Sequence, residues 1–181
     1  MQKPGEKFVY HNVLSVILGE ILKRSVGISG DKFAEEYLFN PLGISTYEWS
    51  KIPDSLLKAD GGLALRPKDM AKFGQLYLND GQWNETQIVP EKLIKESTQP
   101  HIKTTSGAYG YQWWLRSFHI NDRQIDSFYA NGNGGQFIFV FPELSMVVVS
   151  TAQNYDRDWS GRFYEILGSV IFPAVVSSTH K

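Results

Sequence analysis

The sequence of 181 residues contains no cysteine, which excludes disulfide bonds, thiolate catalysis and zinc sites with cysteine ligands. Long apolar runs are lacking too, since no window approaches the roughly 18 uninterrupted apolar residues of a membrane span. The opening residues, Met1 to Lys7, include no apolar stretch of the signal-peptide kind. These absences fit an exported bacterial protein and a cytosolic protein equally, so the compartment stays open.

An excess of positive charge is also lacking. The formal net charge is -1, and the basic residues are scattered along the chain. Binding to nucleic acid needs a cluster of positive charge that faces the phosphates, so we do not expect nucleic acid as a partner. The four histidines, His11, His101, His119 and His180, show no metal-ligand spacing, and we therefore expect neither a metal site nor a cofactor.

What is present is an ordinary globular composition, with 42% hydrophobic residues and enough length for a single domain over 1–181. Hydrophobic periodicity predicts a mainly helical part up to residue 104. Its helices are expected over 12–25 with a stop at Gly27, from a cap at Ser29 to Phe39, from about Pro67, and briefly after Pro90. Residues 42–64 lack periodicity and are expected to be irregular. The side chains expected inside the second, third and fourth helices are Phe33, Ala34, Tyr37, Leu38, Met70, Phe73, Leu76, Tyr77, Leu93 and Ile94.

After residue 105 the pattern changes to that of strands. Residues 109–114 alternate as a two-faced strand does, and residues 136–141 and 146–150 are nearly continuous β-branched and aromatic runs. The two runs are expected to form a hairpin covered on both faces. The spacing of Trp159, Phe163, Ile166, Leu167 and Val170 indicates a closing amphipathic helix. Helices followed by an antiparallel sheet of three or more strands and a closing helix make an α+β fold.

Two segments could carry chemistry. Tyr10 and Asn12 stand two residues apart before the first helix, where a phenol could relay protons and an amide could hold a substrate carbonyl. The alternative is a core tyrosine beside a helix-capping asparagine. The stretch from Ala130 to Gln136 opens an apolar strand with glycines that let a substrate approach the backbone and leave N–H groups free to donate. The alternative there is a plain glycine-rich turn.

Six segments, in order, resemble the serine β-lactamase, penicillin-binding protein and esterase superfamily, and most closely its class C-like branch with the 6-aminohexanoate-dimer hydrolases. The resemblance covers Pro4 to Asn154. Its segments are Pro4 to Asn12, Leu38 to Ile44, Ala59 to Leu63, Arg66 to Gly74, Tyr109 to Trp114, and Gly132 to Gln136. It implies the C-terminal part of the β-lactamase-like fold and no cofactor.

The resemblance also implies a three-part site. Its Tyr-x-Asn motif maps onto Tyr10, as proton relay, and Asn12, as a substrate contact, although His11 stands where a small residue is commoner. Its Lys-Thr-Gly or His-x-Gly motif maps onto Asn133, Gly134 and Gly135, with the Gln136 N–H as an oxyanion donor. Asn133 brings no positive charge to hold a substrate carboxylate, which favours an ester or a simple amide over a penicillin.

The third motif, Ser-x-x-Lys, should lie many tens of residues before Tyr-x-Asn, where this sequence has only nine residues and no serine. Elsewhere the bare pattern occurs at Ser29 to Lys32, Ser55 to Lys58 and Ser178 to Lys181. All three are poor candidates, because we expect them at a helix cap, in an irregular loop and in a C-terminal tail. We therefore expect no nucleophile in these 181 residues.

From this we expect part of a serine hydrolase for esters, amides or β-lactams that is inactive without a missing N-terminal segment. Two alternatives stay open: a non-catalytic binding or regulatory module that keeps the fold, and a split enzyme whose nucleophile comes from a separate polypeptide. In the family fold, N-terminal strands pair with the last strand of the sheet, here Met146 to Ser150. We therefore also expect the chain to self-associate through this strand.

Overall fold

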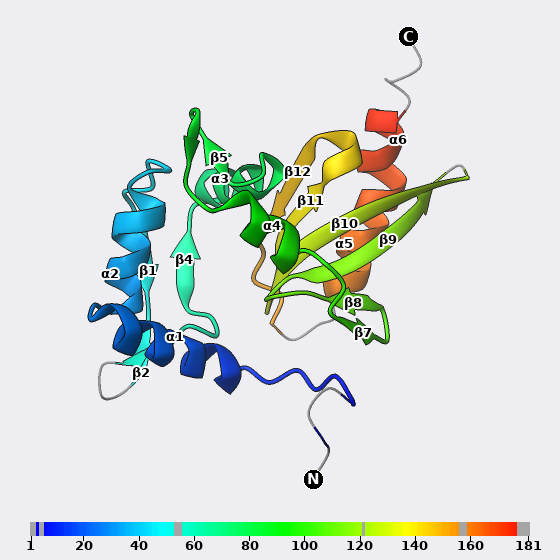
Figure 1. Cartoon of the computed structure of the whole chain (residues 1–181). Helices are drawn as coiled ribbons and strands as arrows, with labels where there is room; N and C mark the ends of the chain where they lie inside the picture. Colours follow the sequence, from blue (N-terminus) through cyan, green and yellow to red (C-terminus); the bar gives the residue numbers. More distant parts are fainter. Residues whose placement is uncertain (1–2, 4–5, 53–55, 121, 156–158, 177–181) are drawn as a thin grey trace. The chain divides into compact units, whose positions relative to one another are not determined.

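Figure 1 shows the chain as a computed structural model, which describes all residues except 1–2, 4–5, 53–55, 121, 156–158 and 177–181. The described residues fall into two compact units, Met1–Glu91 and Lys92–Lys181. The single domain expected over 1–181 stays a prediction.

The helices expected at the start of the first unit are confirmed. They are α1 (Val13–Val26) and α2 (Gly30–Ala34), and α2 continues as a π-helical segment, η1 (Glu35–Phe39). Gly27 ends α1 in the left-handed conformation, with φ of 76°, and its N–H donates to the Lys23 carbonyl at 2.9 Å.

The expected burial of the second helix is wrong for Tyr37, which is 53% exposed, whereas Phe39 is buried. The π-helical turn explains the change of face, because its hydrogen bonds span five residues: the Asn40 N–H donates to the Glu35 carbonyl at 2.9 Å. An α-helical period applied across this turn assigns the inward face to the wrong side chain.

The expectation that residues 42–64 are irregular is also wrong, since they contain four short strands. β1 (Tyr47–Trp49) pairs antiparallel with β4 (Leu63–Leu65), and β2 (Lys51–Ile52) pairs with β3 (Leu56–Leu57). Strands of two or three residues are too short to show an alternating pattern. They matter for the core, because Tyr47, Trp49, Leu63 and Leu65 pack against the buried cluster of Phe39, Leu42, Ile44 and Leu76.

α3 (Pro67–Leu78) begins at its proline as predicted, and the short hairpin of β5 (Gln82–Trp83) and β6 (Thr86–Gln87) follows it. α4 (Glu91–Ser97) starts after Pro90, also as predicted. Of its two expected inward side chains, Ile94 is buried but Leu93 is 47% exposed. A helix of seven residues presents only one row inward, here Ile94 and Ser97, three positions apart.

The N-terminal turn of α3 contains a buried carboxylate, Asp69, which is only 2% exposed. Its Oδ2 lies 3.0 Å from Nε of Arg66 and its Oδ1 lies 2.9 Å from Nζ of Lys72. Lys72 also donates to the Gly43 carbonyl at 2.9 Å, so the carboxylate joins α3 to the turn that follows η1. Burial favours the neutral acid, but the hydrogen bonds and charges of Lys72 and Arg66 outweigh it and lower the pKa of Asp69.

The second unit contains the antiparallel sheet that the sequence predicts, with six strands in the order β12-β11-β10-β9-β8-β7. Every neighbour in this order is also next in the chain, so the sheet is a simple meander, as Figure 1 shows. Its strands are β7 (Ile102–Thr104), β8 (Gly107–Tyr109), β9 (Trp114–Ile120), β10 (Arg123–Gly132), β11 (Gln136–Phe141) and β12 (Met146–Ser150). The predicted hairpin of residues 136–141 and 146–150 is therefore confirmed as β11 and β12.

The single strand expected over residues 109–114 is wrong. Tyr109 ends β8 and Trp114 begins β9, and the two residues pair with each other across a tight turn. Within the turn the Gly110 N–H donates to the Trp113 carbonyl at 2.8 Å, and Gln112 has a φ of 64°. The alternation of aromatic and polar residues in this segment thus comes from a hairpin and not from one strand.

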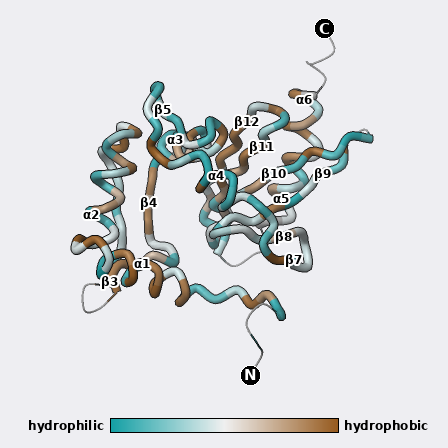
Figure 2. Tube along the Cα trace, in the orientation of Figure 1, coloured by the Kyte–Doolittle hydropathy of each residue, from teal (hydrophilic) through white to brown (hydrophobic). Residues whose placement is uncertain are grey.

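A helical layer covers one face of this sheet. It is formed by α5 (Trp159–Ile166), the π-helical segment η4 (Leu167–Ile171) and α6 (Phe172–Val176), so the closing helix is confirmed. Phe163, Leu167 and Phe172 are buried against Phe137, Phe139 and Phe141 of β11, whereas Val170, expected inside, is 60% exposed. Figure 2 shows the hydrophobic residues concentrated along β11 and β12 within this unit.

Candidate functional site

Tyr10 and Asn12 lie at the N-terminus of α1, as the sequence predicts. Tyr10 is 51% exposed, so it is not a core residue. Asn12 occupies the N-cap position in a helical backbone conformation, and among the described residues its side chain makes no capping hydrogen bond. The alternative interpretation of this pair, a core tyrosine with a capping asparagine, is therefore wrong on both points.

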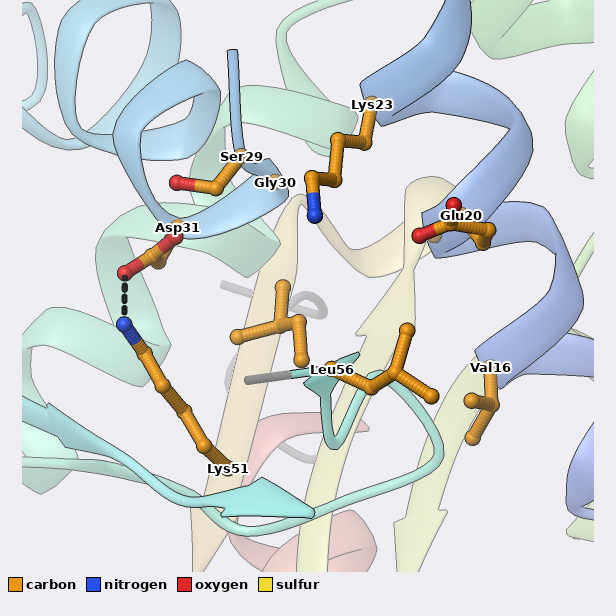
Figure 3. Close-up of a pocket in the computed structure, with 10 residues that line it drawn as sticks. Val16, Glu20, Lys23, Ser29, Gly30, Asp31, Lys51 and Leu56 are labelled. Atoms are coloured by element: carbon orange, nitrogen blue, oxygen red, sulfur yellow. Dashed lines mark ion pairs between the residues drawn. The ribbon is translucent and has the colours of Figure 1, made fainter. Parts of the chain in front are cut away.

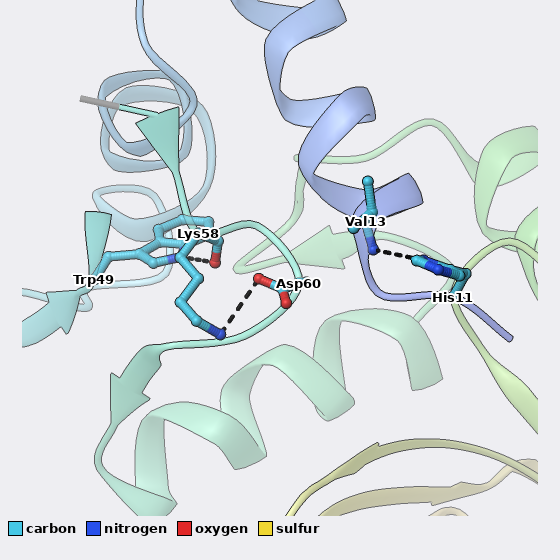
Figure 4. A network of polar contacts seen from close by, with 5 residues as sticks. All are labelled: His11, Val13, Trp49, Lys58 and Asp60. Atoms are coloured by element: carbon cyan, nitrogen blue, oxygen red, sulfur yellow. Dashed lines mark hydrogen bonds and ion pairs between the residues drawn. The ribbon is translucent and has the colours of Figure 1, made fainter. Parts of the chain in front are cut away.

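His11 makes the cap instead. Its Nδ1 accepts a hydrogen bond from the Val13 N–H at 3.3 Å, as Figure 4 shows. The ring is thus bound to the first turn of α1, which satisfies a backbone donor that would otherwise need a side-chain oxygen. His11, the unusual residue in the Tyr-x-Asn motif, therefore caps α1. This cap leaves the Asn12 amide available for another partner.

A charged pair beside α1, Lys58 and Asp60, was not among the residues predicted for the site. The Nζ of Lys58 lies 3.4 Å from Oδ1 of Asp60, and the Lys58 carbonyl accepts a hydrogen bond from the indole of Trp49 at 3.1 Å (Figure 4). Ala59 packs so close to α1 that a Cβ added at Gly19 would lie 3.1 Å from its own Cβ. Asp60 and Lys58 are therefore held next to α1, the helix that Tyr10 and Asn12 precede.

The second group of expected residues forms the turn between β10 and β11. Asn133, Gly134 and Gly135 make the turn, and Gln136 pairs with Gly132 at its base. Gly134 and Gly135 have φ values of 82° and 96°, which lie in the left-handed region that favours glycine. Both glycines are buried, whereas Asn133 is exposed. The structure thus brings these four residues together on one turn of the second unit.

The segment after β12 holds this turn, which the sequence did not reveal. The Asn154 N–H donates to the Gly134 carbonyl at 3.1 Å, and the Gln136 side chain donates to the Ala152 carbonyl. The Tyr155 ring lies against Gly134, since a Cβ there would be 2.6 Å from Cε1 of Tyr155. These contacts join residues about twenty positions apart, so no local pattern could have indicated them.

A small pocket of the first unit lies between α1, α2, β2 and β3 (Figure 3). Asp31 and Lys51 form an ion pair of 3.3 Å at its side. Burial opposes ionisation of Asp31, but hydrogen bonds from Ser29 and Lys51 outweigh it and lower the pKa of Asp31. Within the described chain, Oδ1 of Asp31 and Oε2 of Glu20 have no hydrogen-bond partner.

Ser29 lines this pocket, but its pattern partner Lys32 is paired elsewhere. The Nζ of Lys32 lies 2.6 Å from a carboxylate oxygen of Glu35. A lysine that activates a serine must be within hydrogen-bond reach of the hydroxyl, so the ion pair disfavours Ser29 as a nucleophile. The other two weak candidates, Ser55 and Ser178, lie outside the described residues.

The residues that the structure describes contain no cluster of three or more histidine, aspartate or glutamate side chains suited to a metal ion. None of their helices combines the length and the apolar composition of a membrane span.

The fold corresponds to a known one, the β-lactamase-like fold. The family model described as Beta-lactamase matches residues 1–168, so this chain belongs to the beta-lactamase family. The resemblance inferred from the sequence is confirmed.

Solved structures agree with the family. A candidate 6-aminohexanoate-dimer hydrolase from Bacillus anthracis is 25% identical, with a TM-score of 0.76 over 92% of this chain and 45% of the other. A beta-lactamase from Mycobacterium bovis is 19% identical, with a TM-score of 0.75 over 96% of this chain and 66% of the other. The octameric penicillin-binding protein homologue from Pyrococcus abyssi is 21% identical, with a TM-score of 0.65 over 92% of this chain and 44% of the other.

The chain therefore spans about half to two thirds of the length of these relatives and has part of their α+β fold. No curated protein matches it.

Proposed function

We propose that this chain supplies one part of a serine-hydrolase site that cleaves an ester or a simple amide through an acyl-enzyme. The nucleophile would come from a Ser-x-x-Lys segment outside these 181 residues. Its hydroxyl attacks the substrate carbonyl, the alcohol or amine leaves with a proton, and water then hydrolyses the acyl-enzyme. Because the chain belongs to the beta-lactamase family, acyl transfer through a serine is the reaction that its family supports.

Each expected residue has a role in this proposal. Tyr10 relays the proton between nucleophile and leaving group, and Asn12 donates its amide hydrogen to the substrate. The observation that carries the proposal is the cap made by His11, because it leaves the Asn12 amide without a structural role at the helix end. In the second unit, the turn of Asn133, Gly134 and Gly135 contacts the substrate, and the Gln136 N–H stabilises the oxyanion.

The choice of substrate follows from charge. The family motif at the turn usually begins with a cation or an imidazole, and Asn133 supplies only a neutral amide. A neutral amide cannot offset the desolvation of a substrate carboxylate as a cation does, so uncharged esters and amides are favoured over penicillins.

Incubation of the folded chain with a fluorophosphonate probe is expected to add no mass, because the proposal places the nucleophile in a segment outside these 181 residues. Intact-mass spectrometry measures this directly, and circular dichroism on the same sample confirms that it is folded. The Ser29→Ala variant provides a matched control and should behave identically. A stoichiometric adduct that maps to one serine, and vanishes when that serine is replaced, would contradict the proposal.

We propose as well that the chain self-associates through β12. This strand is the outermost of its sheet, with β11 as its neighbour on one side. Its sequence, Met146 to Ser150, contains neither a charge nor a proline, the two features that commonly protect an edge from pairing. Antiparallel pairing of two copies of this strand would satisfy the outer N–H and C=O groups of both.

The Val147→Lys variant is expected to be monomeric in sedimentation velocity at micromolar concentration, whereas the unmodified chain sediments as a larger species. A lysine on the edge must be desolvated for two strands to pair. Val147→Thr keeps the β-branched shape without charge and should self-associate like the parent, and Ser150→Lys offers a second charge at the strand end. A strictly monomeric parent chain would rule out the interaction.

A further inference from the structure

Three contacts fix the turn at Gly134 to the segment that follows β12. The Asn154 N–H donates to the Gly134 carbonyl at 3.1 Å, the Gln136 amide donates to the Ala152 carbonyl, and the Tyr155 ring packs on Gly134. The ring contact is close: a Cβ at Gly134 would meet Cε1 and Cδ1 of Tyr155 at 2.6 and 2.9 Å. Any residue other than glycine would therefore displace the ring.

The hydrogen bond from Asn154 also sets the direction of the next donor. In a trans peptide the C=O and the following N–H point in opposite directions. Because the Gly134 carbonyl points toward Asn154, the Gly135 N–H points away from that segment. Gly135 is buried, and in the part of the chain that the structure describes its N–H donates to no acceptor. A donor held in this way is ready for a substrate oxygen.

Tyr155 differs from a core aromatic residue, since one part of its ring contacts Gly134 while the residue as a whole is 62% exposed. Its free surface therefore adjoins the turn without being covered by other described residues. An aromatic surface beside a hydrogen-bond donor suits a ligand that combines a carbonyl with an apolar group.

We propose that Tyr155 is a positioning and substrate-contacting residue, which fixes the Gly134–Gly135 peptide through its ring and packs the apolar group of a neutral ester or amide against its open face. This inference rests on the proposed function, because it assumes that the turn from Asn133 to Gln136 binds the substrate carbonyl. It adds the part of the substrate that the turn cannot recognise, namely an alkyl or aryl group next to the carbonyl.

The test uses the full chain labelled with nitrogen-15 and two neutral amides that differ by one ring. Acetanilide carries a phenyl group, and acetamide is the same amide without it. Both are expected to shift the amide signals of Gly135 and Gln136. Acetanilide should bind roughly three- to tenfold more tightly, the range of an aromatic contact. Tyr155→Ala should bring the ratio of the two Kd values close to one, and Tyr155→Phe should keep it.

Tyr111→Ala is the control, since Tyr111 is a comparably exposed tyrosine, 48%, on a different turn of the same unit. It should leave the ratio unchanged. If Tyr155→Ala binds acetanilide as tightly as the unmodified chain, or if the two amides bind equally to that chain, the assignment of Tyr155 is wrong. If neither amide shifts the signals of residues 134–136, the proposed function of the turn fails first, and this inference fails with it.

Discussion

Replacing Tyr10 by phenylalanine is expected to lower kcat for an aryl ester by about 10²- to 10⁴-fold, the usual contribution of a positioned proton-transfer group. The protein to use is this chain joined to a Ser-x-x-Lys segment, where the gene encodes one upstream, because the proposed site would be complete only there. Tyr10→Phe removes one hydroxyl from a residue that is 51% exposed, so the free energy of unfolding should change by less than about 0.5 kcal/mol. A loss of kcat at unchanged stability is the signature of a catalytic role.

Tyr37→Phe is the matched control, because Tyr37 lies in the same unit and is 53% exposed. Its hydroxyl interacts with Glu36, which raises the pKa of Tyr37 for a local reason unrelated to the proposed site. This variant should keep the kcat of the parent. Full activity in Tyr10→Phe would show that Tyr10 is not the proton relay. A gene without any upstream Ser-x-x-Lys segment would instead favour the binding module.

The elements that could be predicted are those whose sequence signal is strong and local. The apolar runs of β11 and β12, the proline at the start of α3 and the glycine after α1 each indicate an element by itself. β10 was not predicted, because its ten residues mix Arg123, Asp126 and Ser127 with apolar side chains. Ser127 is buried only because its hydroxyl donates to the Arg116 carbonyl of β9 at 2.8 Å, a partner eleven residues away.

The same distinction between local signals and long-range contacts applies to the residues of the candidate site. Tyr10 and Asn12 could be proposed from one short motif and the turn at Gly134 from another, because the residues of each motif are neighbours in the sequence. The cap by His11 could not, since histidine is an unusual capping residue and asparagine is a preferred one. Tyr155 was missed because its contact with Gly134 depends on how the chain returns after β12. Residues that support a site from another segment leave no periodic or motif signal.

Asp69→Asn is expected to lower the free energy of unfolding by about 3 kcal/mol near neutral pH, the cost of removing one member of a buried ion pair. The substitution leaves Lys72 without a counter-charge next to a buried amide, and it weakens the link from α3 to the Gly43 carbonyl. Arg66 is largely exposed, so the loss of its ion pair with Asp69 contributes little to the lower free energy of unfolding. Urea unfolding measures the difference, and Glu143→Gln, an exposed carboxylate, is the control.

The same carboxylate should make stability depend on pH in acid. Its folded pKa is lowered from the ordinary value of 3.8, so the unfolded chain binds the proton more readily than the folded chain. The contribution of Asp69 is therefore fully present above about pH 5 and is lost as the pH falls below 3.8 through the folded pKa. The gap in unfolding free energy between the parent and Asp69→Asn should narrow over this range. A gap that stays constant down to pH 2 would show that Asp69 acts through packing and not through its charge.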